Sequence, residues 1–427
     1  MVIFLKYYLV GIKGTGMCAL ANFLKYEGHI VLGSDKKDIY FTDKILLKND
    51  IPFYEYNINN LKDDYVYIIG LSISDNNIEF KEIKNKKYKY YYYNEFIGNI
   101  QNKELICVSG THGKTTTTSF LYQLADNNVS SIIGDGTGYS NINNQYLVVE
   151  SCEYQNHFLK YFPKLGIILN MELDHPDFFN NLKDVIDSFQ KFANNSEILL
   201  INGDDKNSKK IKHKHKYTYG FQKHNDYVIE ILSEFENGYE INIKGKNINI
   251  NIYSKPGIHN IYNLSAAIIA LYILDINIKI KDINLPNRRM NIRKYNNIYV
   301  IDDYAHHPTE IDCLLKSIKQ QFVDYQIYGI FQSHTYSRTL RFKKNFKKVF
   351  LKFDKIYLRD VFSSSREENN ISFQKRIDKY FSCFEKYNID VINNINFNDK
   401  KVFLIFGATP SHEILNLIYQ KYKNENN

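Results

Sequence analysis

The residues most able to do chemistry lie in the segment GTHGKTTTT, residues 110–118. A strand-like run, ELICVS, precedes it and a helix-like run, SFLYQLA, follows it. A strand, a glycine loop and a helix in this order point backbone N–H groups and a helix N-terminus at phosphates. Lys114 would then reach the β- and γ-phosphates of ATP, and the Thr115 hydroxyl would bind magnesium. Val108 stands where the general pattern has its first glycine, yet the flanking strand and helix favour a nucleotide site.

Two further candidates are expected at the same edge of the sheet. The run YLVVE ends at Glu150, and the run GIILN leads directly into MELDH, which ends at His175. In an open α/β sheet, side chains that follow neighbouring strands gather at the carboxyl edge, where ligands bind. Taken singly, either residue could be an ordinary strand end or surface histidine. Beside a phosphate loop, Thr115, Glu150 and His175 are together predicted to bind Mg²⁺.

A second glycine loop, GIKGTG at residues 11–16, follows an apolar run and opens a helix-like run. Its spacing is G-x-x-G-x-G rather than the G-x-G-x-x-G of the NAD turn, which argues against a dehydrogenase. We expect the diphosphate of a UDP-sugar at this helix N-terminus, although the glycines could also serve helix packing alone. The predicted UDP-sugar ligands are Gly11, Gly14, Thr15, Gly16 and, at the end of the next strand, Asp35.

The last third of the chain carries two polar loops, DDYAHHP and QSHTYSR, each after an apolar strand-like run. They concentrate histidines and an arginine where α/β proteins bind ligands, namely His306, His307, His334 and Arg338. No pairing of these histidines has a recognised zinc spacing, and an arginine suits a carboxylate. We therefore expect a carboxylate ligand, and not zinc, at these loops.

Several α/β units are needed to position these loops, because 427 residues are too many for one ordinary core. Strand-like and helix-like runs alternate in three series, which predicts three α/β domains. The alternation in YEINIKGKNININIY, residues 239–253, adds an antiparallel hairpin to the second series. The predicted domains are a Rossmann-like UDP-binding domain over residues 1–97, a central P-loop ATPase-type parallel sheet with the hairpin over 98–287, and a Rossmann-like C-terminal domain over 288–427.

Composition argues against several other classes of protein. Lysine and arginine exceed aspartate and glutamate by 55 − 47 = 8, but the lysines are scattered, so no nucleic-acid partner is expected. Five cysteines without a C-x-x-C pair indicate a reducing cytoplasm. The first apolar run is a poor signal peptide, and no apolar run reaches membrane-spanning length. The sequence therefore predicts a cytoplasmic protein without a membrane partner, and leaves a monomer and a homodimer open.

In their order along the whole chain, these motifs resemble those of the Mur ligases. GIKGTGM is similar to the family's UDP loop, GTHGKTTTT to its ATP loop, and VESCEYQNHF with NMELDHPDFF to its magnesium-binding stretches. PGIHNIYNLSAA resembles a segment near the nucleotide, NRRM a linker into the last domain, and DDYAHHPTEI with FQSHTYSRT the signatures of members that add alanine. The resemblance implies an ATP- and Mg²⁺-dependent ligase of peptidoglycan precursor synthesis that joins L-alanine to UDP-N-acetylmuramate through an acyl phosphate.

The resemblance also implies a role for each matching residue. The catalytic residues would be Lys114, Glu150, His175 and His306, the last as a candidate general base. The implied ATP-binding residues are Gly110, Thr111, His112, Gly113, Lys114, Thr115, Thr116, Asn260, Asn263, Arg289 and Asp303. Which of the adjacent Asp302 and Asp303 reaches ATP stays open. The implied amino-acid-binding residues, all in the C-terminal domain, are Tyr304, His306, His334 and Arg338.

Two departures from the family pattern concern the last domain. Met290 follows Arg289 where the family usually has a phenylalanine, which should alter packing only. The stretch GATPSHEI, residues 407–414, differs from the family's GAGDI-like stretch and leaves the closure of the last loop open.

Two alternatives within reach of the same motifs remain. One is the recycling ligase that attaches an intact tripeptide to the same UDP-sugar, whose signature resembles DDFAHHPTA, so that Tyr304 and Glu310 favour alanine. The other is a non-catalytic nucleotide-binding relative, against which the intact Lys114, Glu150 and His175 argue.

Overall fold

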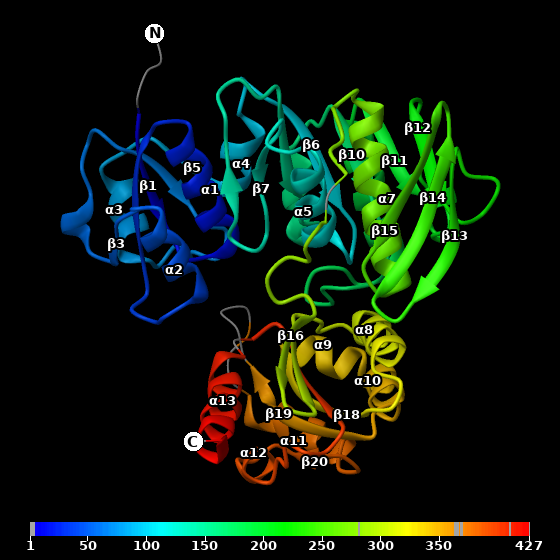
Figure 1. The fold of residues 1–427 in the computed structure, drawn as a ribbon. Coiled ribbons are helices and arrows are strands. Elements are labelled where there is room, and N and C mark those ends of the chain that lie inside the picture. The colour runs from blue at the N-terminus through cyan, green and yellow to red at the C-terminus, as the bar shows by residue number, and fades with distance from the viewer. Residues whose placement is uncertain (1–4, 281, 363–366, 368–369, 410, 427) are drawn as a thin grey trace.

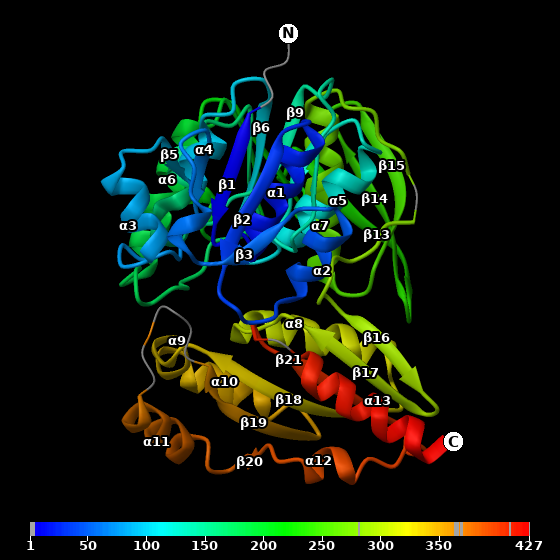
Figure 2. The same cartoon turned by 90° about the vertical axis from the view of Figure 1, so that its left-hand side faces the viewer.

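The computed structural model describes residues 5–280, 282–362, 367, 370–409 and 411–426. It shows three α/β units, each built on its own sheet, which confirms the predicted architecture (Figure 1). In both views the C-terminal unit lies beneath the other two, and α8 (Pro308–Gln321) lies on the side of this unit that faces them (Figures 1 and 2). Among the described residues, no helix combines the length and the apolar character that a membrane crossing requires.

The N-terminal unit is a parallel sheet in the order β3-β2-β1-β4-β5. Its strands are β1 (Lys6–Val10), β2 (Ile30–Asp35), β3 (Phe53–Glu55), β4 (Val66–Ile69) and β5 (Tyr90–Tyr92). Its helices are α1 (Thr15–Tyr26), α2 (Phe41–Lys48), α3 (Ile78–Asn85) and α4 (Tyr93–Gly98), with a 3-10 turn η1 (Ile58–Asn60). The strand order reverses at β1, so the glycine loop that follows β1 lies where open α/β sheets bind ligands.

The central unit is a mixed sheet in the order β15-β14-β13-β12-β11-β10-β6-β9-β7-β8. Its strands are β6 (Glu104–Ser109), β7 (Ser130–Ile132), β8 (Gly138–Tyr139), β9 (Tyr146–Glu150), β10 (Leu165–Ile168), β11 (Ile198–Asn202), β12 (Lys216–Gly220), β13 (Tyr227–Phe235), β14 (Gly238–Gly245) and β15 (Ile248–Ser254). Its helices are α5 (Lys114–Leu124), α6 (Leu182–Asn195) and α7 (Ile258–Ile273), with 3-10 turns η2 (Tyr154–Lys160) and η3 (Ser208–Lys210). The predicted hairpin is β14 and β15, which pair antiparallel.

Strand order in the central sheet decides where the polar loops meet. Strand β6 lies between β9 and β10, and both neighbours run parallel to it. The phosphate loop after β6, Glu150 at the end of β9 and the segment after β10 therefore share one edge of the sheet. These three strands are almost wholly apolar and buried where they pair, as parallel strands covered on both faces require.

Helix α1 is packed between the N-terminal and central sheets. Its residues share one buried apolar cluster with side chains of the central unit such as Leu147 and Phe189. A Cβ atom at Gly138 would lie only 1.8 Å from the Ala19 carbonyl oxygen, so glycine is required for this close approach. A buried ion pair between Lys103 Nζ and Glu27 Oε1, 3.2 Å apart, joins the same two units. These contacts fix the glycine loop of residues 11–16 relative to the phosphate loop.

The C-terminal unit is a six-stranded sheet in the order β16-β17-β21-β18-β19-β20. Its strands are β16 (Asn291–Tyr295), β17 (Ile298–Asp303), β18 (Gln326–His334), β19 (Lys355–Phe362), β20 (Glu385–Lys386) and β21 (Lys401–Phe406), of which only the edge strand β16 pairs antiparallel. Its helices are α8, α9 (Tyr336–Arg341), α10 (Lys343–Phe350), α11 (Ile371–Tyr380), α12 (Asp390–Asn393) and α13 (His412–Asn426).

The predicted domain boundaries at 97/98 and 287/288 stay predictions. The first falls inside α4, and the second falls in the segment between α7 and β16. Of the divergent stretch GATPSHEI, Pro410 lies outside the described residues. Gly407 has φ +136°, and a Cβ atom there would lie 2.4 Å from the Gln332 carbonyl oxygen, so this position requires glycine.

Candidate active site

The phosphate loop runs from the end of β6 to the start of α5, and two of its glycines adopt backbone angles that favour glycine. Gly110 has φ +143° and Gly113 has φ +87°. A Cβ atom at Gly113 would lie 2.4 Å from the Asn263 Oδ1 atom, so α7 packs directly against the loop. The loop therefore has the strand, turn and helix order of an anion-binding site.

Lys114, the first residue of α5, contacts a carboxylate that the sequence analysis did not single out. Its Nζ atom lies 3.0 Å from Glu153 Oε2 and donates to the Thr111 carbonyl oxygen at 3.2 Å. Burial alone would lower the pKa of Lys114, but nearby carboxylates, Glu153 foremost, raise it, so the ammonium is charged at neutral pH. An anionic ligand that reaches this lysine has to compete with Glu153.

The predicted magnesium ligands form two separate groups, Thr115 with Glu150 and His175 with Glu153. Thr115 Oγ1 donates to Glu150 Oε2 at 2.8 Å, and the Gly134 N–H donates to the same carboxylate oxygen at 3.0 Å. His175 has φ +50°, which is uncommon outside glycine, and its Nε2 atom lies 4.0 Å from Glu153 Oε1. Hydroxyl and carboxylate oxygens are the ligands that Mg²⁺ prefers, so Thr115 and Glu150 fit the ion.

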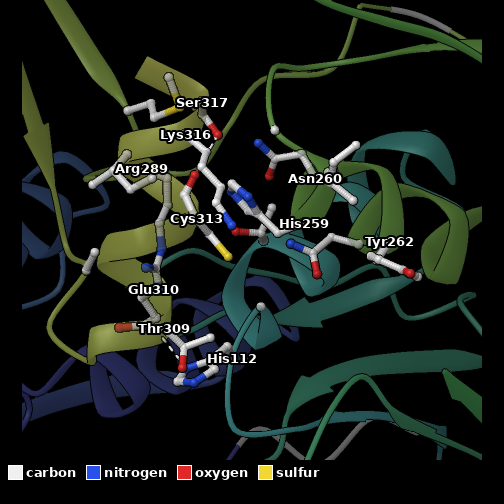
Figure 3. A pocket seen from close by; sticks show the side chains of 18 of the residues that line it. His112, His259, Asn260, Tyr262, Arg289, Thr309, Glu310, Cys313, Lys316 and Ser317 are labelled. Atoms are coloured by element: carbon white, nitrogen blue, oxygen red, sulfur yellow. Dashed lines mark hydrogen bonds and ion pairs between the residues drawn. The ribbon is translucent and has the colours of Figure 1, made fainter. Parts of the chain in front are cut away.

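A cavity of about 640 Å³ opens beside the phosphate loop between α7 and α8 (Figure 3). Its volume lies within the range of about 300–1,000 Å³ that small-molecule sites occupy. Figure 3 shows His259 and Asn260 of α7 opposite Glu310 of α8. The predicted ATP-binding residues that line it are His112, Gly113, Thr116, Asn260, Asn263, Arg289 and Asp303. The other predicted ATP-binding residues, Gly110, Thr111, Lys114 and Thr115, belong to the same loop and helix start.

Asp302 and Asp303 have different surroundings. Asp302 Oδ1 lies 3.5 Å from Arg288 Nε, whereas Asp303 lines the cavity. The Asp303 carboxylate accepts hydrogen bonds from the backbone N–H groups of Met290 and Ala305, at 2.8 and 2.7 Å. Burial raises the pKa of Asp303 to about 6. Of the two aspartates, Asp303 is therefore the one placed to meet a ligand in the cavity.

The four predicted amino-acid-binding side chains form one continuous cluster. The rings of Tyr304 and His306 are 5.2 Å apart, and those of His306 and His334 are 6.4 Å apart. Arg338 Nη1 lies 3.5 Å from His334 Nδ1. Burial lowers the pKa of His306 to about 4, so its imidazole is neutral at pH 7.

Arg338 is bound at both ends of its fork by Asp174, which follows β10. Its Nε atom lies 2.9 Å from Oδ1 and its Nη2 atom 3.2 Å from Oδ2 of this carboxylate. Burial alone would raise the pKa of Asp174, but the Arg338 charge outweighs burial and holds it well below the usual value. The role of Arg338 as an amino-acid ligand stays a prediction, and a substrate carboxylate would have to share or replace Asp174.

A second group of charges joins the phosphate loop to α8. His112 Nδ1 lies 3.2 Å from Glu310 Oε1, and His112 Nε2 lies 3.4 Å from Glu172 Oε2. Thr309 Oγ1 donates to Glu172 Oε2 at 2.8 Å. Burial alone would lower the pKa of His112, but Glu310 and Glu172 raise it to about 9. Burial opposes the charge of Glu172, yet His112 lowers its pKa to about 2.

Glu310 is positioned by the start of α8. Its Oε2 atom accepts hydrogen bonds from the backbone N–H groups of His306 and His307, at 3.0 and 3.1 Å. His307 is the N-cap residue, and Pro308 occupies the first turn without loss of a helical hydrogen bond. One carboxylate therefore caps the helix and binds His112 of the central unit.

The N-terminal glycine loop has the same construction as the phosphate loop. Gly11 has φ +87°, and Gly14 precedes α1. Asp35 Oδ2 accepts a hydrogen bond from the Lys13 N–H at 2.8 Å. All the predicted UDP-sugar ligands therefore lie at the carboxyl edge of the N-terminal sheet, and their role stays a prediction.

Four carboxylates of the site were missed from the sequence, namely Glu153, Glu172, Asp174 and, as a ligand of the phosphate loop, Glu310. Three of them lie within the quoted segments VESCE and MELDH. Their basic partners lie far away in the chain, so no local spacing could reveal the pairs.

Comparison with known proteins identifies the family. Three family models match successive parts of the chain: Mur ligase family, catalytic domain, over residues 6–104, Mur ligase middle domain over 108–271, and Mur ligase, glutamate ligase domain, over 288–374. Proteins named UDP-N-acetylmuramate–L-alanine ligase from Lactococcus lactis subsp. cremoris (strain MG1363) and Streptococcus agalactiae serotype III (strain NEM316) are 34% and 33% identical over 417 residues. Each alignment covers 94% of this chain and 94% of the relative. The chain belongs to the Mur ligase family.

The Mur ligase fold is also seen in solved structures. A UDP-N-acetylmuramate-alanine ligase from Thermotoga maritima superposes with a TM-score of 0.80 at 24% identity, covering 98% of this chain and 99% of that chain. A murein peptide ligase from Psychrobacter arcticus superposes with a TM-score of 0.72 at 19% identity, over 98% and 99% of the two chains. At these identities the likeness establishes the fold alone.

The raised pKa of His112 predicts how the stability of this Mur ligase depends on pH. An unfolded histidine has a pKa of about 6.5, and His112 in the folded chain has a pKa of about 9. The contribution of His112 to the free energy of unfolding is therefore fully present below pH ~6.5 and is lost as pH rises through about 9. We expect the unfolding temperature of the parent, relative to His112→Gln, to fall by about 2 °C or more between pH 6.5 and 9.5 in calorimetry.

The matched control is His259→Gln, which removes another histidine that lines the same cavity. Burial lowers the pKa of His259 to about 4. The difference in unfolding temperature between the parent and His259→Gln should therefore change with pH below pH ~6.5 and stay constant above it. If the difference in unfolding temperature between the parent and His112→Gln does not change between pH 6.5 and 9.5, His112 is not charged in the folded protein.

Proposed function

We propose that this Mur ligase joins L-alanine to UDP-N-acetylmuramate, with ATP as the energy source, as a UDP-N-acetylmuramate–L-alanine ligase of peptidoglycan precursor synthesis. The observation that carries the proposal is full-length similarity, at 34% identity over 94% of both chains, to a protein of that name. The cavity beside the phosphate loop and the Tyr304–Arg338 cluster next to it support the proposal, because ATP and an amino acid must meet in such a reaction.

The chemistry requires activation of a carboxylate, since its oxygen is a poor leaving group toward an amine. A muramic acid carboxylate oxygen attacks the γ-phosphorus of ATP, and ADP leaves with the bridging oxygen. The alanine amine then attacks the acyl carbon, inorganic phosphate leaves and the nitrogen loses a proton. Phosphoryl transfer of this kind depends on positioning and on neutralising negative charge.

The central unit supplies the groups for the first step. Lys114 carries a positive charge at the start of α5. The backbone N–H groups there and the positive end of the helix dipole also favour a phosphate. Thr115 and Glu150 would hold Mg²⁺, which neutralises phosphate charge when bound. Asn260, Asn263 and Asp303 line the cavity in which the rest of the nucleotide would lie.

The C-terminal unit supplies the groups for the second step. His306 Nδ1 lies 3.1 Å from the Tyr304 carbonyl oxygen, which leaves Nε2 to accept a proton from an incoming amine. The imidazole is neutral at pH 7, as a base must be before the reaction. Its low pKa makes it a weak base in the ligand-free protein, so the charge of a bound ligand would have to raise that pKa.

The proposed reaction predicts which substrates are needed for phosphate release. Release of phosphate from ATP should require both UDP-N-acetylmuramate and L-alanine, with the alanine adduct of the UDP-sugar as product by mass spectrometry. Omission of either substrate should leave the rate at background. Efficient use of an intact tripeptide in preference to alanine would assign the chain to the recycling ligase instead, and no phosphate release with either would support a non-catalytic relative.

A second outcome concerns Lys114 and the separation of the two phosphate-binding loops. Lys114→Ala should lower turnover by at least ~100-fold, because the loop loses its positive charge toward the transferred phosphoryl group. Affinity for the UDP-sugar, measured by calorimetry, should change by no more than about twofold, because that loop belongs to another sheet. A matching loss of UDP-sugar affinity in a folded Lys114→Ala variant would show that the two sites are not separate.

A third outcome separates the two possible roles of Arg338. Lysine keeps the charge but loses the fork, so Arg338→Lys should raise the KM for alanine by about tenfold or more, with the KM for ATP nearly unchanged. Asp174→Asn is the matched variant, because it removes the carboxylate that now occupies the fork. If Arg338 binds the alanine carboxylate, Asp174→Asn should leave the KM for alanine unchanged or lower it. Equal increases in both variants would instead make Arg338 a residue that docks the two units.

A further inference from the structure

Three side chains from distant parts of the chain meet where the phosphate loop faces α8. They are His112 of the loop, Glu172 of the segment after β10, and His307, the N-cap residue of α8. Each offers a ligand atom, and these atoms all lie within 4.8 Å of one another. The exposed fractions of the two histidine side chains are 14% and 6%, and that of Glu172 is 38%. The group is thus shielded from solvent on its histidine side and open at its carboxylate.

Each of the two histidines has a buried ring nitrogen without a hydrogen bond to the described residues. Within the described part of the chain, the Nε2 atoms of His112 and His307 are buried and have no hydrogen-bond partner. His112 Nε2 lies 3.4 Å from Glu172 Oε2 as an ion pair without hydrogen-bond geometry, so a metal ion at this nitrogen would replace its proton. A buried polar atom without a hydrogen bond costs about 1–3 kcal/mol, so two of them in rings whose centroids are 4.9 Å apart indicate a missing ligand.

The remaining polar atoms of the same side chains are held by neighbours. His112 Nδ1 lies 3.2 Å from Glu310 Oε1, and His307 Nδ1 accepts from the Thr309 N–H at 3.4 Å. Thr309 Oγ1 donates to Glu172 Oε2 at 2.8 Å. Metal-binding histidines commonly use the second ring nitrogen in this way, because the contact fixes the ring and its tautomer. The Nε2 atoms of both rings have no hydrogen bond to any described residue, while His307 Nδ1 lies 4.0 Å from Glu172 Oε2.

We propose that His112, Glu172 and His307 bind one transition-metal ion of the zinc class, which bridges the central and C-terminal units. Two imidazoles and one carboxylate suit zinc, cobalt or nickel, whereas magnesium prefers oxygen ligands. Ligands about 2.0–2.1 Å from a tetrahedral ion are about 3.4 Å apart, which matches the separation of His112 Nε2 and Glu172 Oε2. The fourth position is open to water on the exposed side of Glu172.

The site is distinct from the predicted magnesium ligands, because it shares no residue with Thr115, Glu150 and His175. It adjoins the cavity proposed for ATP, because His112 and Glu172 also line that cavity. A bound ion would hold α8 against the phosphate loop. Metal of this class should therefore stabilise the closed arrangement of the two units, whether or not substrates are present.

Cobalt and zinc alone, added to the chelator-treated full-length protein, test the proposal. We expect the parent to bind one equivalent of Co²⁺ with the intense visible absorption of a tetrahedral ion, and Zn²⁺ to displace it. His307→Asn keeps a good N-cap residue but removes the imidazole, and Glu172→Gln removes the carboxylate charge. Both should weaken Zn²⁺ binding by more than ~100-fold in competition with a chromophoric chelator, and Glu310→Gln by at least ~10-fold.

His306→Gln and His175→Gln are the matched controls, because each removes a neighbouring histidine outside the proposed ligand set. Both should keep the tetrahedral absorption and the Zn²⁺ affinity of the parent. Unfolding temperatures without metal identify any variant that does not fold, and a Zn²⁺-dependent rise in that temperature should occur in the parent and be lost in His307→Asn. Failure of the parent to bind, an octahedral cobalt spectrum, or equal Zn²⁺ affinity in His307→Asn and the parent would overturn the proposal.

Discussion

The site depends on one physical constraint: charges of the C-terminal unit are paired only when that unit lies against the edge of the central sheet. Arg338 reaches Asp174 and Glu310 reaches His112, and both pairs are largely buried. Removing one partner of a buried ion pair costs about 3–5 kcal/mol, because the other charge is left without compensation. A partial separation of the units would therefore leave several charges without a partner. Only full entry of water would compensate them. The interface favours a closed, dry state and an open, wet state over intermediates.

This constraint suits the proposed chemistry. An acyl phosphate reacts with water as well as with amines, so the amine must meet it where water is excluded. The phosphate loop belongs to the central sheet, whereas Tyr304, His306 and His334 belong to the C-terminal unit. The two halves of the reaction therefore come together only in the closed state. In contrast, α1 fixes the N-terminal unit to the central unit through apolar packing and the close approach of Gly138 to Ala19.

Much of this organisation could be predicted from the sequence, because it follows from local patterns. Apolar strand runs followed by glycine loops predicted the three sheets and the edge at which Lys114, Glu150 and His175 gather. The pairs that hold the units together could not be predicted in this way. Arg338 and Asp174 are separated by 164 positions, and His112 and Glu310 lie in different units. A charged residue beside a motif does not reveal its partner, and the spacing rules for zinc sites apply to ligands that are close in sequence.

The same pairs explain how a site with so many charges remains stable without ligands. Lys114 is paired with Glu153, and Arg338 with Asp174, so the cations expected to meet a phosphate and a carboxylate already contact carboxylates of the chain. Each anionic ligand must displace an internal carboxylate, which lowers the net gain from its charge because one ion pair replaces another. Binding energy then comes mainly from contacts that the internal carboxylates do not make, such as those in the cavity lined by Asn260 and Arg289. Specificity in this site therefore depends on the shape and length of the ligand more than on its charge, since any small anion can offer the charge but not the remaining contacts.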